Sequence, residues 1–400
     1  MLVSHWRRNR SRALIPPLDA KRALRFVVLI GIVNLFADLT YEGARGVGGA
    51  FLGHLGASGA AIGAIAGGGE LAGYAIRSVS GAIADRTGLY WIETWAGYAI
   101  NMLCVPALAL VGSWPAAAGL MIGERAGRGI RKPVVSAMLA QAGTRLGSGR
   151  VFGVNEALDQ TGATLGPLVV AVAIARGGFP AGFGVLIVPA VLTLAFLALA
   201  NVAGRAILPR YEDATESPVR DWPEFRRYAI GGALIAAGYV DFALIAFRFA
   251  RDHVVSVPAI SIWFAVAMAV GAIASPILGQ LFDRWRNWVI VVALVVTAAA
   301  TPLVFLGRGA IAGLGVVLWG LAGAVQSTPL LALVAGVVSR RRGATGFGLY
   351  DLIFGSAWFA GSAIAGALLD RSVVALVLFS TLLQLAAIPF FAGGRAAARV

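Results

Sequence analysis

The sequence predicts an all-α integral membrane protein with twelve transmembrane helices, arranged as two pseudo-symmetric halves of six. Three observations support this fold class. The 400 residues are 59% hydrophobic and only 13% charged, with a mean hydropathy of +0.82, which is too little charge to cover a soluble surface. Apolar runs of roughly 20 residues, long enough to cross a bilayer as helices, recur along the chain. Short patterns also repeat between the two halves of the sequence.

The apolar runs follow one another with short polar breaks. Transmembrane strands would need alternating segments of about 10 residues, whereas these runs are longer and uniformly apolar. Glycine is abundant, at 52 of 400 residues, and small residues let membrane helices approach closely. We expect helical spans near residues 25–52, 58–84, 92–113, 115–141, 150–175, 180–204, 226–250, 256–282, 287–307, 309–338, 345–369 and 373–393.

Two longer polar stretches divide the chain. Residues 1–24 are rich in arginine and contain Pro16-Pro17. They predict a cytoplasmic tail rather than a signal peptide, because no short apolar core with a small-residue cleavage site follows. Residues 208–225 are charged and predict a cytoplasmic linker. The expected halves are therefore residues 25–207 and 226–400.

The net charge of +14 comes from 33 Lys and Arg against 19 Asp and Glu. Such an excess would by itself suggest a nucleic-acid partner. About 22 of the basic residues, however, lie in the tails, the linker and alternate loops, and about four lie in the opposite loops. Because basic loops stay in the cytoplasm, we expect an inner-membrane protein with both termini cytoplasmic and no nucleic-acid partner.

An internal repeat supports two halves of one design. Four patterns recur in the same order, with offsets that drift slowly from 203 to 195 residues. Two such halves about an axis along the membrane normal are a known transporter plan. The matched patterns are Phe36-Ala37-Asp38 and Arg45 with Tyr239-Val240-Asp241 and Arg248, Gly81/Asp85-Arg86 with Gly279/Asp283-Arg284, Gly127/Pro133 with Gly323/Pro329, and Phe152-Gly153/Glu156 with Phe347-Gly348/Asp351.

The first local motif, SGAIADRTGLYW, lies between the second and third expected spans. It resembles the loop signature Gly-x-x-x-Asp-Arg-x-Gly-Arg-[Lys/Arg] of the major facilitator superfamily, although Leu89 and Tyr90 stand where basic residues are usual. A carboxylate here can cap a helix N-terminus or pair with arginine, and so close the cytoplasmic side. The residues assigned to this gating motif are Gly81, Asp85, Arg86 and Gly88, with the echo Asp283 and Arg284.

The second motif, ERAGRGIRKP, lies in the fourth expected span. Arg125-x-x-Arg128-Gly129 is similar to the family signature Arg-x-x-Gln-Gly, with Arg128 in place of glutamine. Charges within a span are costly and usually mark a transport pathway or a buried pair. The alternative for Arg131 and Lys132 is that both lie at a membrane edge and extend to the interface.

The third motif is the glycine series Gly153, Gly162 and Gly166, followed by Pro167. It resembles the family's so-called antiporter motif, without the final glycine pair of that motif. Glycines at this spacing give a flat helix face and Pro167 adds a bend, which predicts a hinge or a seal between the halves. The resemblance also implies antiport. Residues 38–52 and 69–86 resemble a bacterial branch of the family for which no substrate is known.

The family resemblance implies a central cavity near the bilayer midplane, lined mainly by spans 1, 4, 7 and 10. Asp38, Tyr41, Glu42 and Arg45 follow i, i+3, i+4, i+7 spacing, so they share one helix face. Such a polar stripe in a membrane helix should face the bundle interior. The remaining candidates for the solute and proton pathway are Glu70, Arg77, Glu124, Arg125, Arg128, Asn155, Glu156, Asp159, Gln160, Asp241, Arg248, Gln326 and Asp351.

Some of these acids are candidates for proton coupling. A carboxylic acid held away from water resists losing its proton, which is the property that coupling requires. We expect Asp38 or Glu42 to carry the proton, followed by Glu156 or Asp159. The alternative is that the acids are permanent partners of the basic residues Arg45, Arg77, Arg125 and Arg128.

Other activities lack sequence support. No phosphate-binding GxxxxGK[ST] loop occurs, the three histidines are scattered, and Cys104 is the single cysteine. We therefore expect a non-enzymatic monomer without cofactor or metal, with a small solute and H+ as partners. The predicted function is secondary transport by alternating access, as proton-coupled antiport or export. The alternatives are proton-coupled uptake of an anionic metabolite and a transport-inactive receptor or scaffold.

Overall fold

The computed structural model describes residues 20–204, 219–338 and 343–392, and within these ranges the regular secondary structure is helical apart from one isolated bridge between Val219 and Val338. The expected tail and most of the expected linker lie outside the described residues. The all-α expectation is confirmed. Large apolar side chains such as Val202 and Val295 are exposed, as expected of a surface that faces lipid.

The first group of helices runs from α1 to α6. These are α1 (Ala20–His54), α2 (Gly59–Thr87), α3 (Tyr90–Ala107) with the short η1 (Leu108–Leu110), α4 (Trp114–Leu146), α5 (Ser148–Gly184) and α6 (Ile187–Gly204). The second group comprises α7 (Trp222–Gly238), α8 (Phe242–Arg251), α9 (Val257–Trp285), α10 (Asn287–Thr297), α11 (Ala300–Leu306), α12 (Ala310–Val325), the π-helical η2 (Gln326–Leu330), α13 (Leu331–Val337), α14 (Gly343–Arg371), α15 (Val373–Ala386) and α16 (Ile388–Ala392).

Eight helical segments among the described residues are long and apolar enough to cross a membrane. One of them, Arg150–Gly204, contains 55 residues and would extend about 80 Å as one helix, far beyond a ~30 Å hydrocarbon core. Its backbone leaves helical geometry at Gly177 and Gly178, where φ is 66° at Gly178. This segment therefore suits two crossings. When this segment is counted as two crossings and α2, α3 and α4 are added, the helical segments correspond to the expected spans. The number of crossings stays a prediction.

The matched repeat patterns take different local structures. Asp38 lies inside the continuous helix α1, whereas Asp241 lies at a break between α7 and α8. The Asp241 carboxylate caps α8 by accepting a hydrogen bond from the Ala243 backbone N–H at 2.9 Å. Asp is a favoured N-cap residue because its oxygen satisfies an unpaired helix N–H. The same residue type therefore faces the interior in one group and starts a helix in the other.

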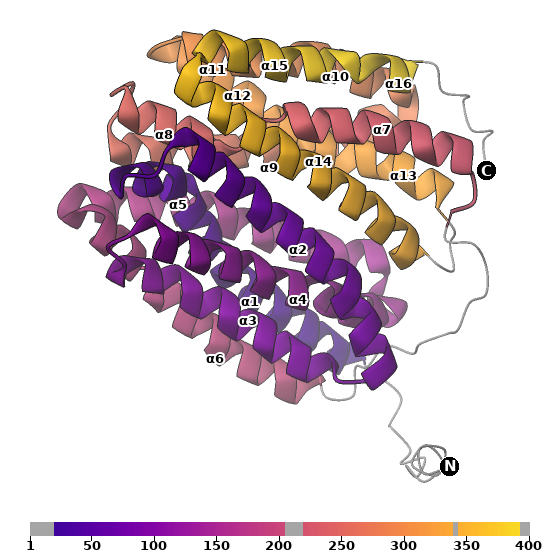
Figure 1. Cartoon of the computed structure of the whole chain (residues 1–400). Coiled ribbons are helices and arrows are strands. Elements are labelled where there is room, and N and C mark those ends of the chain that lie inside the picture. Colours follow the sequence, from indigo (N-terminus) through magenta and orange to yellow (C-terminus); the bar gives the residue numbers. More distant parts are fainter. Residues whose placement is uncertain (1–19, 205–218, 339–342, 393–400) are drawn as a thin grey trace, which may run out of the picture.

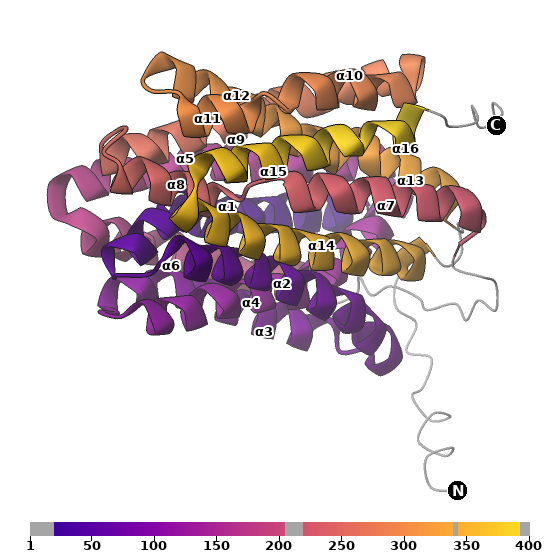
Figure 2. The same cartoon turned by 45° about the horizontal axis from the view of Figure 1, so that its top comes forward.

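The two groups of helices pack side by side along their length (Figures 1 and 2), with α1–α6 in indigo to magenta and α7–α16 in red to yellow. Across their interface α2 packs on α14, α5 on α9, and α1 on α8. All three contacts join helices that lie far apart in the sequence. The packing of these helices therefore sets how the interior residues of one group lie relative to those of the other.

At one end of the molecule the two groups meet through glycines. A side chain on Gly63 of α2 would clash with the Ser362 carbonyl of α14, and one on Gly49 of α1 would clash with the Ala243 carbonyl of α8. Asp370 at the end of α14 accepts hydrogen bonds from the backbone N–H groups of Gly59 and Ala60, each at 2.8 Å. We call this the sealed end, because only glycine lets the backbones approach so closely.

Candidate functional site

Toward the opposite end, the cavity end, a cavity of about 1130 Å³ separates α4 and α5 from α9 and η2. A second cavity of about 330 Å³ lies deeper among α2, α12 and α14. The volumes are comparable to those of solute-binding pockets, which run from about 300 to 1,000 Å³. The two cavities share the lining residues Arg77, Gln160, Ser275, Ser327 and Leu331.

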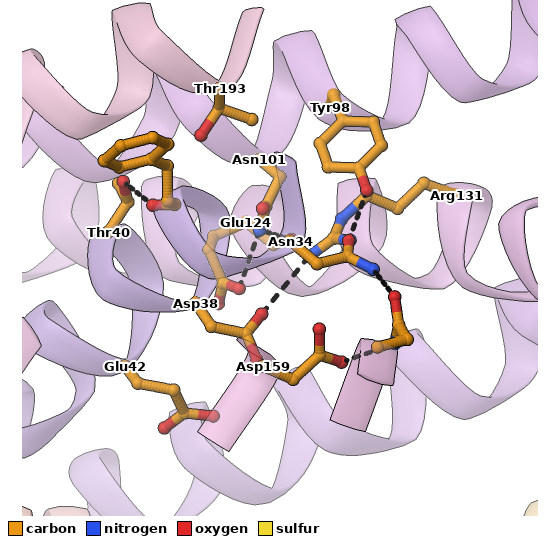
Figure 3. Close-up of polar contacts among 12 residues, drawn as sticks. Asn34, Asp38, Thr40, Glu42, Tyr98, Asn101, Glu124, Arg131, Asp159 and Thr193 are labelled. Atoms are coloured by element: carbon orange, nitrogen blue, oxygen red, sulfur yellow. Dashed lines mark hydrogen bonds and ion pairs between the residues drawn. The ribbon is translucent and has the colours of Figure 1, made fainter. Parts of the chain in front are cut away.

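Arg131 organises a buried polar cluster in the α1–α6 group (Figure 3). Its Nη1 donates to Asn34 Oδ1 at 3.2 Å, and its Nη2 lies 4.0 Å from Asp38 Oδ1. Its guanidinium carbon also lies 4.3 Å from the ring centroid of Tyr98, a cation–π distance. Because Arg131 is only 3% exposed, the alternative that it extends to a membrane edge is wrong.

The same cluster continues into α5. Asn34 Nδ2 donates to Asn155 Oδ1 at 2.8 Å, and Asn155 Nδ2 donates to Asp159 Oδ2 at 3.2 Å. Within the described residues, Asp159 Oδ1 has no hydrogen-bond partner. Asp38 and Asp159 both line a third cavity, of about 410 Å³, together with Lys132 and Glu156. The two buried carboxylates therefore share a hollow with cationic groups.

Arg45 forms a second cluster, which joins the two groups of helices. Its Nη1 lies 3.5 Å from Glu42 Oε1, and its Nη2 lies 3.3 Å from Glu70 Oε1. The same Nη2 lies 3.9 Å from Asp241 Oδ2 in the other group. A charge this far from water needs such partners, because an unpaired buried ion is strongly unfavourable.

Arg125 extends this second cluster along α4. Its Nη2 lies 3.4 Å from Glu70 Oε1 and its Nε lies 3.4 Å from Glu124 Oε2. Glu124 Oε1 in turn accepts a hydrogen bond from Asn101 Nδ2 at 2.9 Å. Glu70 is thus shared by Arg45 and Arg125, so the charges of α1, α2 and α4 form one network.

The remaining cations of the site differ in their partners. Arg77 lies 3.6 Å from Asp351 Oδ2 and so forms a second ion pair between the two groups. The Arg128 guanidinium lies 4.6 Å from the ring centroid of Tyr41. Among the described residues, neither Arg128 nor Lys132 has an ion pair or a hydrogen bond through its charged group. Permanent pairing therefore accounts for Arg45, Arg77 and Arg125 but not for Arg128.

Other expected pathway residues are more scattered. Glu156 lines the large cavity, where its Oε1 accepts a hydrogen bond from Gln160 Nε2 at 2.7 Å, and Gln326 lines the smaller one. Arg248 instead pairs with Asp252 and lies 3.5 Å from the Phe305 carbonyl, outside the lining of the cavities described above.

The expectation of a seal between the halves at the glycine series is wrong. Gly162 and Gly166 press on the backbone of α1 at Leu35 and Leu39, within the same group of helices. A side chain on Gly153 would meet nothing within 4 Å. Pro167 lies within α5. The series therefore holds α5 against α1, and the seal lies on α2–α14 and α1–α8.

The residues of the loop motif lie at the cavity end. Gly88 caps the C-terminus of α2 with φ of 71°, a conformation that favours glycine. A side chain on Gly81 would lie 3.4 Å from Pro133, which is ordinary contact. Arg86, Asp283 and Arg284 are exposed, and the side chain of Asp85 lies outside the described residues. None of these three residues forms a hydrogen bond or an ion pair with the other group of helices in the described part of the chain.

Several residues of the site escaped sequence analysis. Asn34 precedes Asp38 by four positions, so the helical spacing that identified the α1 stripe could have included it. Tyr98 and Asn101 come from α3, which carries no motif. Their roles depend on the packing of α3 against α4, which the sequence alone does not show.

Comparison with known proteins decides the family. The family model described as Major Facilitator Superfamily matches residues 30–362. The chain belongs to the major facilitator superfamily. It is 34% identical over 382 residues to uncharacterized proteins of Mycobacterium bovis and Mycobacterium tuberculosis, covering 92% of each chain.

Solved structures of this superfamily share the fold. A bacterial homolog to the human lysosomal transporter Spinster, inward-facing and unoccupied, aligns with a TM-score of 0.74 at 15% identity, covering 94% of this chain and 99% of that one. The nucleoside transporter NupG aligns with a TM-score of 0.70 at 15% identity, over 92% of this chain and 99% of that one. The protein is therefore a multi-pass membrane transporter of the secondary type and not an enzyme.

Proposed function

We propose that this transporter moves a small organic solute by alternating access and couples that movement to protons. One observation carries the proposal: the two groups of helices touch through glycines at the sealed end and enclose a large cavity at the cavity end. A solute in that cavity reaches only one side of the membrane. Access changes sides when the glycine contacts separate and the cavity end closes.

The proposed orientation follows from the basic residues. The cavity end carries the exposed Arg86 and Arg284, and basic loops favour the cytoplasm. We therefore place the cavity end at the cytoplasmic face of the inner membrane, with both termini on that side. Residues 25–207 and 226–400 move as the two bodies of a monomer, joined by the linker 208–225.

Asp38 is the proposed proton-carrying residue. Its carboxylate is buried, lies 4.0 Å from its cationic partner Arg131, and lines a cavity with Asp159. Glu42 is less suited, because Arg45 lies closer, at 3.5 Å. A loosely paired acid can gain or lose a proton without leaving a tightly bound cation unpaired.

The sense of coupling depends on the charge of the solute. Antiport with export, which the α5 glycine series implies by resemblance, requires proton and solute to exclude each other. Symport requires them to bind together. Lys132 lines both the Asp38 cavity and the large cavity, so protonation of Asp38 would leave more positive potential for an anion. This observation favours proton-coupled uptake of an anionic metabolite as the second candidate.

Transport by the purified protein in liposomes tests the proposal. A pH-sensitive dye inside the vesicles reports proton movement while a panel of acidic, neutral and basic organic solutes is supplied. Wild type should accumulate its solute when a pH gradient is imposed. Asp38→Asn should keep solute exchange but lose pH-driven accumulation. Asp221→Asn should behave like wild type, because Asp221 is exposed and asparagine can still cap α7.

Two results would contradict the proposal. Retained pH-driven accumulation in both Asp38→Asn and Glu42→Gln would remove these acids from coupling. Absence of flux for every solute in wild type, with the protein correctly folded, would favour the inactive receptor or scaffold.

A further inference from the structure

We infer that the solute is a flat, aromatic organic anion, whose charged end binds the cations of α4 and whose ring binds the aromatic side chains of the α7–α16 group. This inference rests on the proposed transport function and specifies its substrate class. It comes from an asymmetry of the cavities, in which the cations and the aromatic rings are contributed largely by different groups of helices.

The cationic side consists of Arg128 and Lys132, with Arg77 beside them in the lining of the large cavity. The Arg128 guanidinium lies over the ring of Tyr41, and its Nε has no hydrogen-bond partner in the described part of the chain. Neither nearby carboxylate forms an ion pair with these two cations among the described residues: Glu156 accepts a hydrogen bond from Gln160, and Asp351, in the deeper cavity, is paired with Arg77. A carboxylate or phosphate of the solute would supply the direct, hydrogen-bonded ion pair that neither cation forms among the described residues.

The aromatic side lies in the deeper cavity. Tyr239 stacks on Trp319 with ring centroids 5.0 Å apart and meets Trp358 edge-to-face at 5.2 Å. Phe354 continues this cluster at 5.8 Å from Trp358. All four rings line the deeper cavity, and aromatic rings favour offset-stacked or edge-to-face neighbours at such spacings.

Trp358 supplies a second, independent sign of a ligand. Its side chain is only 8% exposed, and within the described residues its Nε1 has no hydrogen-bond acceptor. The indole of Trp319 is different, because its Nε1 donates to the Val240 carbonyl at 2.8 Å. Buried indole N–H groups normally have partners, and because Trp358 lines the deeper cavity, an acceptor on a bound solute would supply the missing one.

The two sides belong to one site, because both cavities share Arg77, Gln160 and Ser327 in their linings. Arg77 lies at this junction and is paired with Asp351 of the other group. An anion bound at Arg128 and Lys132 with its ring among the aromatic side chains would therefore span both groups of helices. Binding and the change of access would then act on the same contacts.

Binding to the purified full-length protein in lipid nanodiscs tests the inference, with empty nanodiscs as the blank. The probes share one shape and differ in charge or aromaticity: 2-naphthoate, 2-naphthamide, 2-naphthylmethylamine and the saturated decahydronaphthalene-2-carboxylate. Titration calorimetry should give 2-naphthoate an affinity at least tenfold above that of the amide, the amine and the saturated acid.

Variants assign each preference to its residues. Arg128→Gln should weaken 2-naphthoate binding at least tenfold and leave 2-naphthamide within about twofold, because only the anion uses the charge. Arg284→Gln removes the same charge from the exposed last turn of α9 and should leave 2-naphthoate binding unchanged. Trp358→Leu should lower the affinity for 2-naphthoate to about the affinity for decahydronaphthalene-2-carboxylate. Circular dichroism and melting temperature confirm that each variant is folded.

Equal affinity for the anion, the amide and the amine would overturn the inference, as would equal weakening of all probes by Arg128→Gln. No binding of 2-naphthoate at millimolar concentration would also overturn it. These outcomes differ from failure of the proposed function, because binding requires neither flux nor a proton-carrying acid. Asp38→Asn should still bind 2-naphthoate.

Discussion

Asp370 offers a direct way to change which end of the transporter is closed. Its carboxylate accepts hydrogen bonds at 2.8 Å from the N–H groups of Gly59 and Ala60, on the other group of helices. Asp370→Ala removes both bonds whenever the sealed end is closed. The open state has no such contact to lose, so the substitution should favour opening.

The magnitude follows from helix capping. Loss of an N-capping side chain costs about 0.5–2 kcal/mol, and here the cap stabilises one conformation only. With 1.4 kcal/mol per tenfold change, the ratio of open to closed sealed end should rise about 2- to 30-fold. Ser58→Ala is the matched control, because Ser58 caps the same helix within its own group by accepting from the Ala61 N–H at 3.2 Å.

Pulsed electron spin resonance on a cysteine-free Cys104→Ala background measures the ratio. Spin labels at Leu110 and Leu306, which are 88% and 58% exposed, report the separation of the two groups near the sealed end. Asp370→Ala should increase the long-distance population. The reasoning would be refuted if Asp370→Ala left the distances unchanged, or if Ser58→Ala produced the same shift.

Two further substitutions test the packing and the buried charges by thermal unfolding in detergent. Gly162→Ala should destabilise the protein by about 1–3 kcal/mol through overpacking against α1. Gly153→Ala should not destabilise it, because the space around Gly153 is open. Equal effects of the two substitutions would contradict the assigned contacts. Arg131→Gln removes the buried cation that donates to Asn34 and lies near Asp38, and it should cost about 1.5–3 kcal/mol, against little change for the exposed Arg86→Gln. An equally stable Arg131→Gln protein would show that this arginine does not hold the cluster together.

Much of the fold could be predicted because hydropathy and helical spacing are local properties. The stripe of Asp38, Glu42 and Arg45 was identified from its i, i+4, i+7 spacing, and the structure places all three in the interior. The repeat matches Asp38 with Asp241 in sequence. It could not show that Asp241 starts a helix, because a break depends on the packing around it.

Partners contributed by distant helices could not be predicted. The pairing of Arg45 with Glu70, and of Arg77 with Asp351, depends on which helices become neighbours. The seal between the halves was assigned to Gly162 because glycine spacing predicts close packing but not the partner. The structure gives that partner as α1, and it assigns the seal to Gly49 and Gly63, which no motif had identified.

The glycine contacts of the sealed end also bear on how fast the protein can change access. Where two helices meet through interlocking side chains, separation forces those side chains into new rotamers, and each adjustment adds to the barrier. At Gly49 and Gly63 backbone faces backbone, so there is little to rearrange when the surfaces part. We expect the glycine contacts at this end to add little to the barrier to separation. The rate of turnover should then be set mainly by the charged contacts of Arg45 and Arg77.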